Sequence, residues 1–126
     1  MTVNSQYNAC AIGTTNKAIN YYYSHFFNDE TTENYYVPYL ITQRYNIAPR
    51  NHYEEFLFQE GTGALLFAFI QEESYEGEML EVRYYWVDNR LVHEIVTGSD
   101  RVASAAQAAA TAEYLLNAFD SLMPAQ

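Results

Sequence analysis

Hydrophobic and polar residues alternate most regularly in the middle of the chain, in three aromatic-rich runs. The runs are His52–Glu60, Ala64–Glu73 and Met79–Thr97. Alternation with a period of two is typical of strands that bury one face, and β-branched and aromatic residues favour that conformation. Glycine, aspartate and asparagine stand between the runs or divide them, as tight turns require. The pattern predicts an antiparallel sheet of consecutive hairpins around which the rest of the chain is organised.

The pair Asp88-Asn89 divides the third run and predicts a two-residue hairpin turn, because both residues tolerate the positive φ that such a turn needs. The turn fixes which residues lie opposite each other on the two faces. On one face the expected partners are Trp86 with Leu91, Tyr84 with His93 and Val82 with Ile95; on the other they are Tyr85 with Val92 and Arg83 with Glu94. This register gathers the largest rings on one side and opposes unlike charges.

Gly61-Thr62-Gly63 predicts a three-residue loop between the first two runs, with Gly63 in the left-handed region. The expected pairing sets Phe58, Phe56 and Glu54 opposite Leu66, Ala68 and Ile70, and sets Leu57 and Glu55 opposite Phe67 and Phe69. The run Ala64–Ile70 is apolar on both faces. It therefore predicts a central strand that is covered from both sides.

Two segments precede these hairpins. Residues Asn16–Phe27 follow Thr14 and Thr15, either of which suits a helix cap, and we expect an N-terminal helix. Its apolar residues at helical spacing are Ile19, Tyr22, Tyr23, Phe26 and Phe27. A polar segment follows and predicts an exposed loop. Tyr35–Tyr45 then alternates as a strand does, and Pro38 restricts that strand to an edge or bulged position.

The C-terminal segment Arg101–Met123 is rich in alanine, follows a stop at Thr97–Asp100 and precedes Pro124, which together predict a helix. Its apolar stripe comprises Val102, Ala105, Ala109, Ala112, Leu116, Phe119 and Met123. The stripe would pack closely on a sheet or, alternatively, form the seam of a homodimer. The expected fold is α+β, with an antiparallel four- to five-stranded meander sheet, an N-terminal helix and a C-terminal alanine-rich helix packed on it. Residues 1–126 form one domain.

Composition narrows the classes of function. A chain of 126 residues with 49% hydrophobic content suits one folded domain. The net charge of −10, from 16 acidic and 6 basic residues, argues against nucleic acid and anionic membranes as partners. No apolar run approaches the roughly 20 residues of a transmembrane helix, and Met1–Gln6 do not have the pattern of a signal peptide. Cys10 is the only cysteine, so no intrachain disulfide forms.

Few residues suggest chemistry. His52 and Glu54 share a strand face, but a metal site needs more converging ligands, so we expect neither metal nor cofactor. His93 is expected beside Tyr84 on the face of Trp86, where it most simply forms a hydrogen bond with a tyrosine. In the alternative in which His93 is a general base, Glu54 would be its nearest acidic residue. No motif for a nucleophile or for phosphate binding is present, and we predict no catalytic residue. The candidate binding residues are Tyr84, Trp86, His93, His52 and Glu54.

Thirteen tyrosines are the unusual feature of the chain. Those at 35, 36, 39, 45, 53, 75 and 85 cannot all be core, so either the terminal helices cover them or they form an exposed face. Exposed aromatic rings near carboxylates bind carbohydrates, peptides or other proteins. We therefore predict a non-enzymatic binding or inhibitory module that uses an aromatic-rich sheet face. The alternatives are a small nuclear-transport-factor-2-like cone, with a ligand or catalytic pocket near His93 or His52, and a dimeric acidic partner-binding protein such as a secretion chaperone.

The aromatic strands also resemble a group of known proteins. Tyr39–Ile47, Asn51–Phe58, Leu65–Phe69 and Val82–Val92 are similar to segments of uncharacterised small secreted or lipid-anchored bacterial proteins. Those proteins resemble the PepSY and β-lactamase-inhibitor-protein type of α+β fold. The resemblance implies a periplasmic or extracellular binding protein and carries over no catalytic residue. The chain departs from it in having no lipobox before Cys10 and no export signal.

Overall fold

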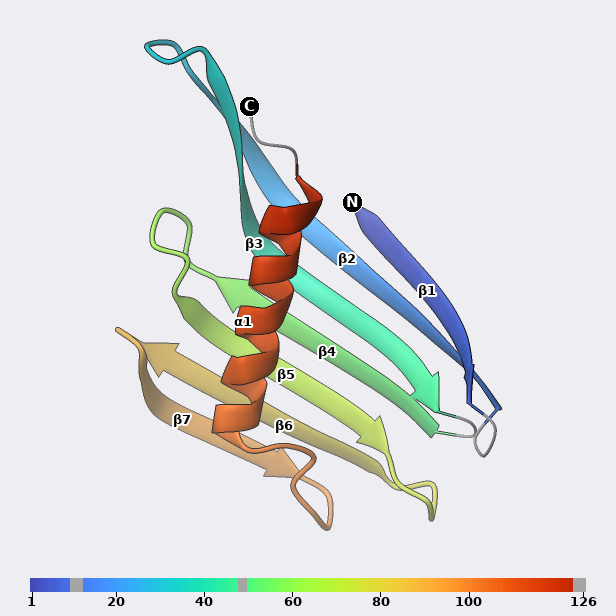
Figure 1. The fold of residues 1–126 in the computed structure, drawn as a ribbon. Helices are drawn as coiled ribbons and strands as arrows, with labels where there is room; N and C mark the ends of the chain where they lie inside the picture. The colour runs from blue at the N-terminus through green and yellow to red at the C-terminus, as the bar shows by residue number, and fades with distance from the viewer. Residues whose placement is uncertain (10–12, 48–49, 124–126) are drawn as a thin grey trace.

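The structure, a computed structural model, describes residues 1–9, 13–47 and 50–123, with the side chains of 4–9, 13–15 and 47 left out. The described residues form one antiparallel sheet in which strand order follows chain order, and one helix crosses the sheet (Figure 1). The elements are β1 Thr2–Ala9, β2 Gly13–Asn28, β3 Glu33–Ile47, β4 Arg50–Phe58, β5 Leu65–Glu73, β6 Met79–Val87, β7 Arg90–Thr97 and α1 Ala105–Leu122. The predicted α+β meander is confirmed, with seven strands rather than four or five. Cys10 and Pro124, which were named above, lie outside the described residues.

The predicted N-terminal helix is wrong, because residues 16–27 lie within β2. The side chains there alternate, since Tyr21 is 1% exposed whereas Tyr22 is 45% exposed. β2 pairs with β1 along one edge and with β3 along the other. The β1 ladder covers residues 13–20 of β2 and the β3 ladder covers residues 16–28, so sheet pairing satisfies much of the backbone. Tyrosine, phenylalanine and isoleucine also suit a half-buried strand better than a helix. The helical spacing of the aromatic residues therefore does not reflect a helix.

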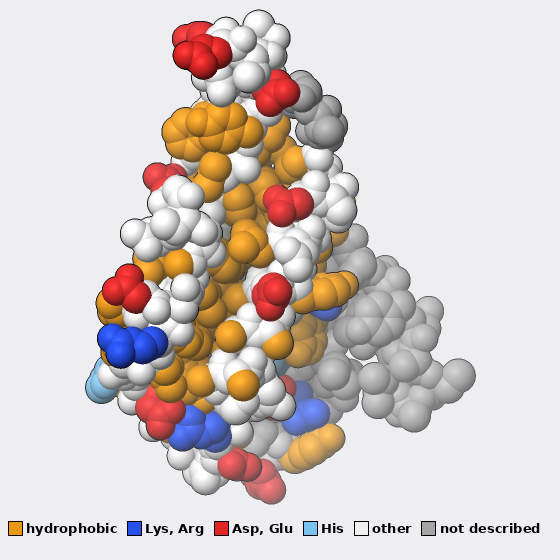
Figure 2. Space-filling view, turned by 60° about the vertical axis from the view of Figure 1, so that its left-hand side comes forward, with side chains coloured by type: hydrophobic (Ala, Val, Ile, Leu, Met, Phe, Trp, Pro, Cys, Tyr) orange, Lys and Arg blue, Asp and Glu red, His pale blue; other side chains and the backbone are white. Residues whose placement is uncertain are grey.

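The β2–β3 hairpin carries the predicted strand and its irregular proline. Pro38 pairs with Tyr23, and the register shifts at Tyr22/Tyr23 because Tyr39 is an extra residue in β3. Residues 33–39 of β3 have no partner in β4, whose pairing begins at Leu40. Pro38 is therefore both bulged and on an edge, as its missing N–H requires. The acidic turn of this hairpin extends beyond the sheet (Figures 1 and 2).

The loop after β4 shifts one of the predicted pairs. Phe56 faces Ala68, Glu54 faces Ile70, and the outer pairs Leu57–Phe67 and Glu55–Phe69 also form as predicted. Phe58 instead faces Leu65, because the register shifts between Leu57 and Phe58 and the loop closes between Gln59 and Ala64. β5 lies inside the sheet, but α1 covers only one of its faces, so the expected cover on both sides is absent in the described structure.

The Asp88-Asn89 turn forms as predicted, with φ of 50° and 64°, and Trp86 faces Leu91. Beyond this pair the predicted register is wrong, because Val92 is an extra residue and shifts all later pairs by one. Tyr85 faces His93, Tyr84 faces Glu94, Arg83 faces Ile95 and Val82 faces Val96. A bulge of this kind inserts one extra residue into one strand, and the alternation pattern of the sequence did not reveal it.

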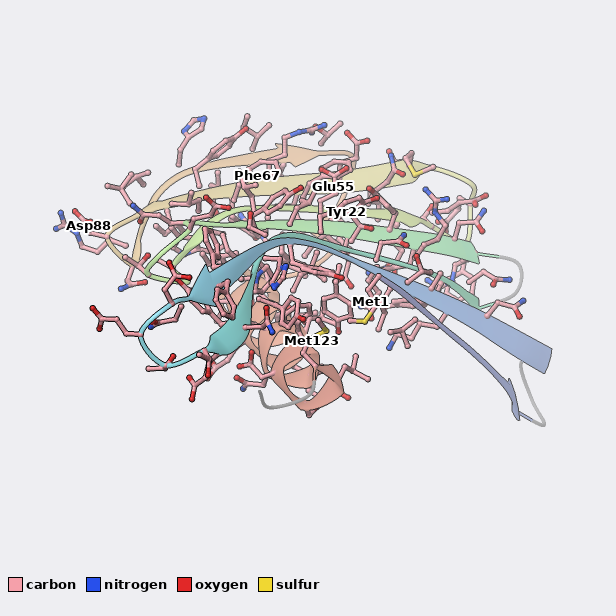
Figure 3. All side chains as sticks on the ribbon, turned by 90° about the horizontal axis from the view of Figure 1, so that it is seen from above. Met1, Tyr22, Glu55, Phe67, Asp88 and Met123 are labelled. Atoms are coloured by element: carbon pink, nitrogen blue, oxygen red, sulfur yellow. The ribbon has the colours of Figure 1, made fainter. Side chains whose placement is uncertain are left out.

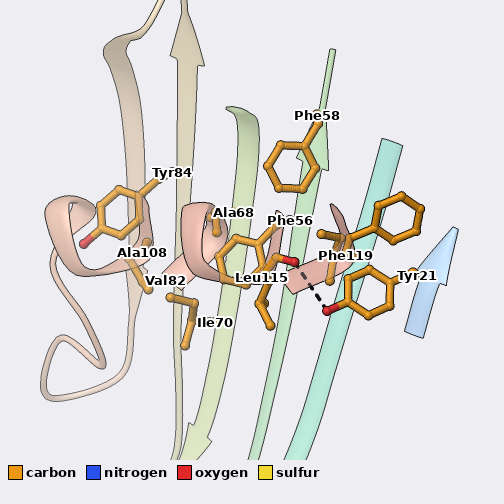
Figure 4. Close-up of a cluster of buried hydrophobic side chains, with 12 residues drawn as sticks. Tyr21, Phe56, Phe58, Ala68, Ile70, Val82, Tyr84, Ala108, Leu115 and Phe119 are labelled. Carbon is orange, nitrogen blue, oxygen red and sulfur yellow. Dashed lines mark hydrogen bonds between the residues drawn. The ribbon is translucent and has the colours of Figure 1, made fainter. Parts of the chain in front are cut away.

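The helix begins later than predicted. Its N-cap is Ser104, and Ser104 and Gln107 form a reciprocal capping box, so residues 101–104 are not helical. The buried helix residues are Ala108, Ala112, Leu115 and Phe119, which share Ala112 and Phe119 with the predicted stripe. The small alanines bring α1 close to the sheet, and the tyrosine hydroxyl of Tyr21 donates to the Leu115 carbonyl at 3.3 Å (Figure 4). No described helix has the length and apolar character needed to span a membrane.

α1 divides the sheet into two unlike faces. The inner face, beneath α1, carries the buried core, whose sheet residues include Tyr21, Ile41, Phe56, Ala68, Val82 and Tyr84. The outer face carries Tyr22, Glu55 and Phe67, which point away from α1 (Figure 3). The described part of the chain places no element on that face. One alternative was that two terminal helices cover the tyrosines. In the described part of the chain a single helix covers one face of the sheet, so the tyrosines of the outer face are not covered in this way.

Candidate ligand-binding pocket

Polar residues enter the inner face at one end of three adjacent strands. Every second residue of β4 is buried, and these residues are His52, Glu54, Phe56 and Phe58. The inner face of β4 is therefore polar near the start of the strand and aromatic near its end. The sheet register places Gln43 of β3 opposite Glu54 and places Glu72 of β5 opposite His52. Four polar side chains from three strands thus meet on a face that is otherwise apolar.

These side chains form one chain of contacts, defined here as the polar network Gln43–Glu54–His52–Glu72. The Gln43 amide Nε2 donates a short hydrogen bond to Glu54 Oε1. The other oxygen of Glu54 lies 3.4 Å from His52 Nε2, and His52 Nδ1 lies 3.0 Å from Glu72 Oε1. Gln43 and Glu54 are each 5% exposed, and His52 is 8% exposed. Burial of a carboxylate is costly unless it is paired, and this network supplies the pairing.

The two carboxylates determine the protonation of His52. Burial opposes the charged imidazolium, but contacts with Glu54 and Glu72 outweigh it and raise the pKa of His52. The imidazolium is therefore favoured, with a carboxylate near each ring nitrogen. A His–carboxylate pair was expected from the shared strand face of His52 and Glu54, while Glu72 was not anticipated as a partner.

Two buried atoms of the network lack a hydrogen-bond partner among the described residues. They are Gln43 Oε1 and His52 Nε2. The His52 nitrogen still has Glu54 at ion-pair distance. The Gln43 oxygen has no such compensation. An unsatisfied buried acceptor costs about 1–3 kcal/mol, so this oxygen marks a position where a donor would stabilise the protein.

A pocket of about 540 Å³ opens beside this network, between the sheet and the flank of α1. Its sheet residues are Lys17, Gln43, Tyr45 and Glu54, and its helix residues are Ala110, Thr111 and Tyr114. Tyr45 stacks on His52 with ring centroids 4.4 Å apart, and Lys17 Nζ lies 5.6 Å from the Tyr45 centroid. Tyr114 is 69% exposed and leaves a ring available at the rim. The volume is within the range of small-molecule sites.

The remaining predicted site residues lie elsewhere. Tyr84 and Trp86 lie on the inner face, 5.9 Å apart, and Tyr84 is fully buried. Tyr84 donates to the Ala103 carbonyl and accepts from Arg101. Arg101 also binds Glu94, and this hydrogen bond lowers the pKa of that carboxyl. Tyr84 thus anchors the segment that leads into α1.

His93 is not beside Tyr84, as predicted, but on the outer face beside Tyr85, with ring centroids 5.6 Å apart. The cause is the extra residue Val92, which moves His93 to the other face. His93 is also exposed and does not line the pocket beside the polar network. The predicted group therefore separates into the His52–Glu54 pair, the Tyr84–Trp86 pair and His93.

Sequence reasoning missed Lys17, Tyr114 and the role of Gln43. Gln43 was predictable, because the alternation of Tyr35–Tyr45 places it on the same face as Ile41. Lys17 was assigned to a helix, and Tyr114 lies outside the predicted stripe. No group of three or more His, Cys, Asp or Glu side chains in the described residues has the geometry to hold a metal ion.

Comparisons with protein-family models, with curated proteins and with solved structures find no match to this chain. Function is therefore argued from the geometry of the site.

Proposed function

We propose that the protein binds a small neutral hydroxylated ligand, a mono- or disaccharide, in the pocket between α1 and strands β2–β4. The observation that carries the proposal is the buried, unpaired oxygen of Gln43 beside the Glu54 carboxylate at the pocket floor. Both atoms are acceptors, so they favour a ligand that brings hydrogen-bond donors. This proposal keeps the predicted binding role and locates it beneath the helix.

The charges around the pocket favour a neutral ligand. Glu54 and the chain's net charge of −10 disfavour an anion, while Lys17 disfavours a cation. A hydroxyl both donates and accepts, so one polyol satisfies Glu54 and Gln43 as acceptors and Lys17 as a donor. The exposed Tyr114 ring and the Ala110 methyl group supply an apolar wall for the carbon face of a sugar.

The same geometry argues for binding rather than catalysis. A general base needs a ring nitrogen within reach of the substrate proton. Both nitrogens of His52 already face carboxylates, Nε2 toward Glu54 and Nδ1 toward Glu72. In this arrangement both ring nitrogens of His52 are directed at carboxylates of the polar network, and His52 is not among the residues that line the pocket.

The test is saturation-transfer NMR with a panel of common mono- and disaccharides, followed by titration of any sugar that binds. We expect the Ala110→Trp variant to lose binding at least about tenfold, because an indole on this lining residue occupies part of the space that the ligand needs. Ala106 is the matched control, since it is exposed one turn earlier on α1 and does not line the pocket. The Ala106→Trp variant should bind as the wild type does.

A second variant, Glu54→Gln, removes the charge and should weaken the same sugar, with unfolding temperatures recorded to exclude loss of fold. Absence of binding across the whole panel by the wild-type protein would contradict the proposal. Equal loss from Ala110→Trp and Ala106→Trp would place the ligand elsewhere.

A further inference from the structure

The outer face of the sheet presents three parallel rows of side chains that cross strands β2–β7, each row perpendicular to the strands. The sheet register defines them. The first row is Tyr22, Leu40, Leu57, Phe67, Tyr85 and His93; the second is Asn20, Thr42, Glu55, Phe69, Arg83 and Ile95; the third is Ala18, Arg44, Tyr53, Gln71, Glu81 and Thr97. We call these residues the outer patch.

The first row of the outer patch is apolar or aromatic along its whole length. Tyr22 and Leu57 are 45% and 38% exposed, and no described element covers the row. Phe67 and Tyr85 pack against each other with centroids 5.0 Å apart. A continuous apolar strip across a sheet exceeds the scattered apolar residues of an ordinary surface and indicates an interaction site.

The charges of the outer patch balance, unlike those of the whole chain. It holds Arg44 and Arg83 with Glu55 and Glu81, while the net charge of the chain is −10. Arg44 lies over the ring of Tyr53 at 4.9 Å and Arg83 over that of Phe69 at 4.5 Å. The acidic excess lies outside the patch. A second copy of the chain can therefore approach this face without like-charge repulsion.

We infer that the outer patch is the interface of a homodimer, in which two sheets pack face to face about a two-fold axis parallel to the strands, between β4 and β5. The axis exchanges β4 with β5, β3 with β6 and β2 with β7, and six strands make the patch symmetric about it. Each row then meets its own copy, as an isologous contact requires. The apolar rows of the two copies then pack on each other along one side of a sheet-on-sheet interface, and the charged rows pack beside them.

Charge complementarity selects this orientation. In the third row, Arg44 of β3 lies over Glu81 of the other copy. In the second row, Arg83 of β6 lies over Thr42 of the other copy and one strand from its Glu55. The two-fold axis repeats each contact. A two-fold axis along the apolar row is the alternative. It would place the second and third rows of the two copies on opposite sides of the apolar row, so Arg44 would not meet Glu81 of the other copy.

The first test is the oligomeric state by sedimentation velocity and light scattering. The wild type should be dimeric at about 100 μM, a concentration at which weak homodimers assemble. Leu57→Asp, next to the axis, should give a monomer, since each dimer would bury two carboxylates. The control is Leu122→Asp, which alters a 48% exposed residue of α1 and should leave the dimer intact. A monomeric wild type, or dissociation by Leu122→Asp, would overturn the inference.

The second test is a charge exchange that fixes the orientation. Arg44→Glu and Glu81→Arg should each raise the dimer dissociation constant at least about tenfold, and the double exchange should restore it to within about threefold of wild type. Arg90→Glu makes the same change of charge at an exposed residue outside the patch and should have little effect. Thermal unfolding of each variant excludes loss of fold as the cause. Failure of the double exchange to recover dimerisation would overturn the proposed pairing.

Discussion

At the scale of residues, one histidine couples the fold to pH. Burial disfavours the imidazolium of His52, but Glu54 and Glu72 outweigh burial and raise its pKa above 6.5. A raised pKa in the folded state means that the stabilisation is fully present below the pKa of the unfolded chain. It is lost as pH rises through the higher pKa of the folded state.

We therefore predict that the free energy of unfolding falls as pH rises from about 6.5, the pKa of the unfolded chain, through the higher pKa of His52 in the folded state, by about 1.4 kcal/mol for each unit by which that pKa is raised. Urea unfolding at several pH values measures it. His52→Gln should be less stable at low pH and should lose most of this dependence. A wild-type stability that rises over this interval would contradict the ion-pair account of His52.

Sequence alone predicted part of the pocket at this scale. The alternation of β4 places His52 and Glu54 on one face, because two residues per repeat is a property of any strand. Glu72 became a partner only through the register between β4 and β5, in which it faces His52. The roles of Lys17 and Tyr114 were not predicted. The periodicity assigned Lys17 to a helix, whereas it lies in a strand, and it placed Tyr114 outside the apolar stripe of the C-terminal helix.

At the scale of elements, α1 lies close to the sheet because its central residues are small. Ala108 and Ala112 are 0% and 1% exposed, so no room remains for larger side chains there. Ala106 lies on the same helix but faces solvent. The two positions distinguish packing from helix propensity, because leucine and alanine are both good helix formers.

We predict that Ala108→Leu destabilises the protein by about 1–3 kcal/mol through overpacking, while Ala106→Leu changes stability by no more than about 0.5 kcal/mol. Chemical denaturation followed by far-ultraviolet circular dichroism measures both. Equal effects at the two positions would show that the alanine stripe does not face the sheet. The homodimer seam that the sequence predicts on the apolar stripe stays a prediction, and two residues of that stripe, Ala112 and Phe119, are buried in the protein's own core.

The hydrophobic pattern predicted some of these elements and not others. The Asp88-Asn89 turn was predicted at the right residues and the loop at Gly61–Gly63 within one residue, since glycine, asparagine and aspartate tolerate positive φ. The register beyond Trp86 was not predicted correctly, because one bulged residue in β7 moves every later side chain of that strand to the opposite face of the sheet. In β2, apolar residues at 19, 22, 23, 26 and 27 fit a helix, yet pairing with β1 and β3 decided the outcome. Sheet pairing, with which the strand propensity of these residues agrees, therefore outweighs helical spacing in this segment.

At the scale of the whole molecule, one helix cannot cover both faces of a seven-stranded sheet. α1 buries the inner face and leaves a polar pocket at its flank, while the outer face stays uncovered in the described chain. The two proposals therefore concern separate surfaces. A sugar in the pocket and a second copy on the outer patch make independent predictions, and the pocket variants should leave the dimer unchanged.

Both surfaces depend on β2, because it places Lys17 in the pocket and Tyr22 on the outer patch. The most direct measurement is a nuclear Overhauser experiment on isotope-labelled protein. We predict cross-strand contacts between the β2 and β3 backbones, and contacts between the Tyr21 and Phe119 rings, whose centroids lie 5.2 Å apart. Helical contacts between residues three apart across 16–27, without the Tyr21–Phe119 contact, would contradict the account.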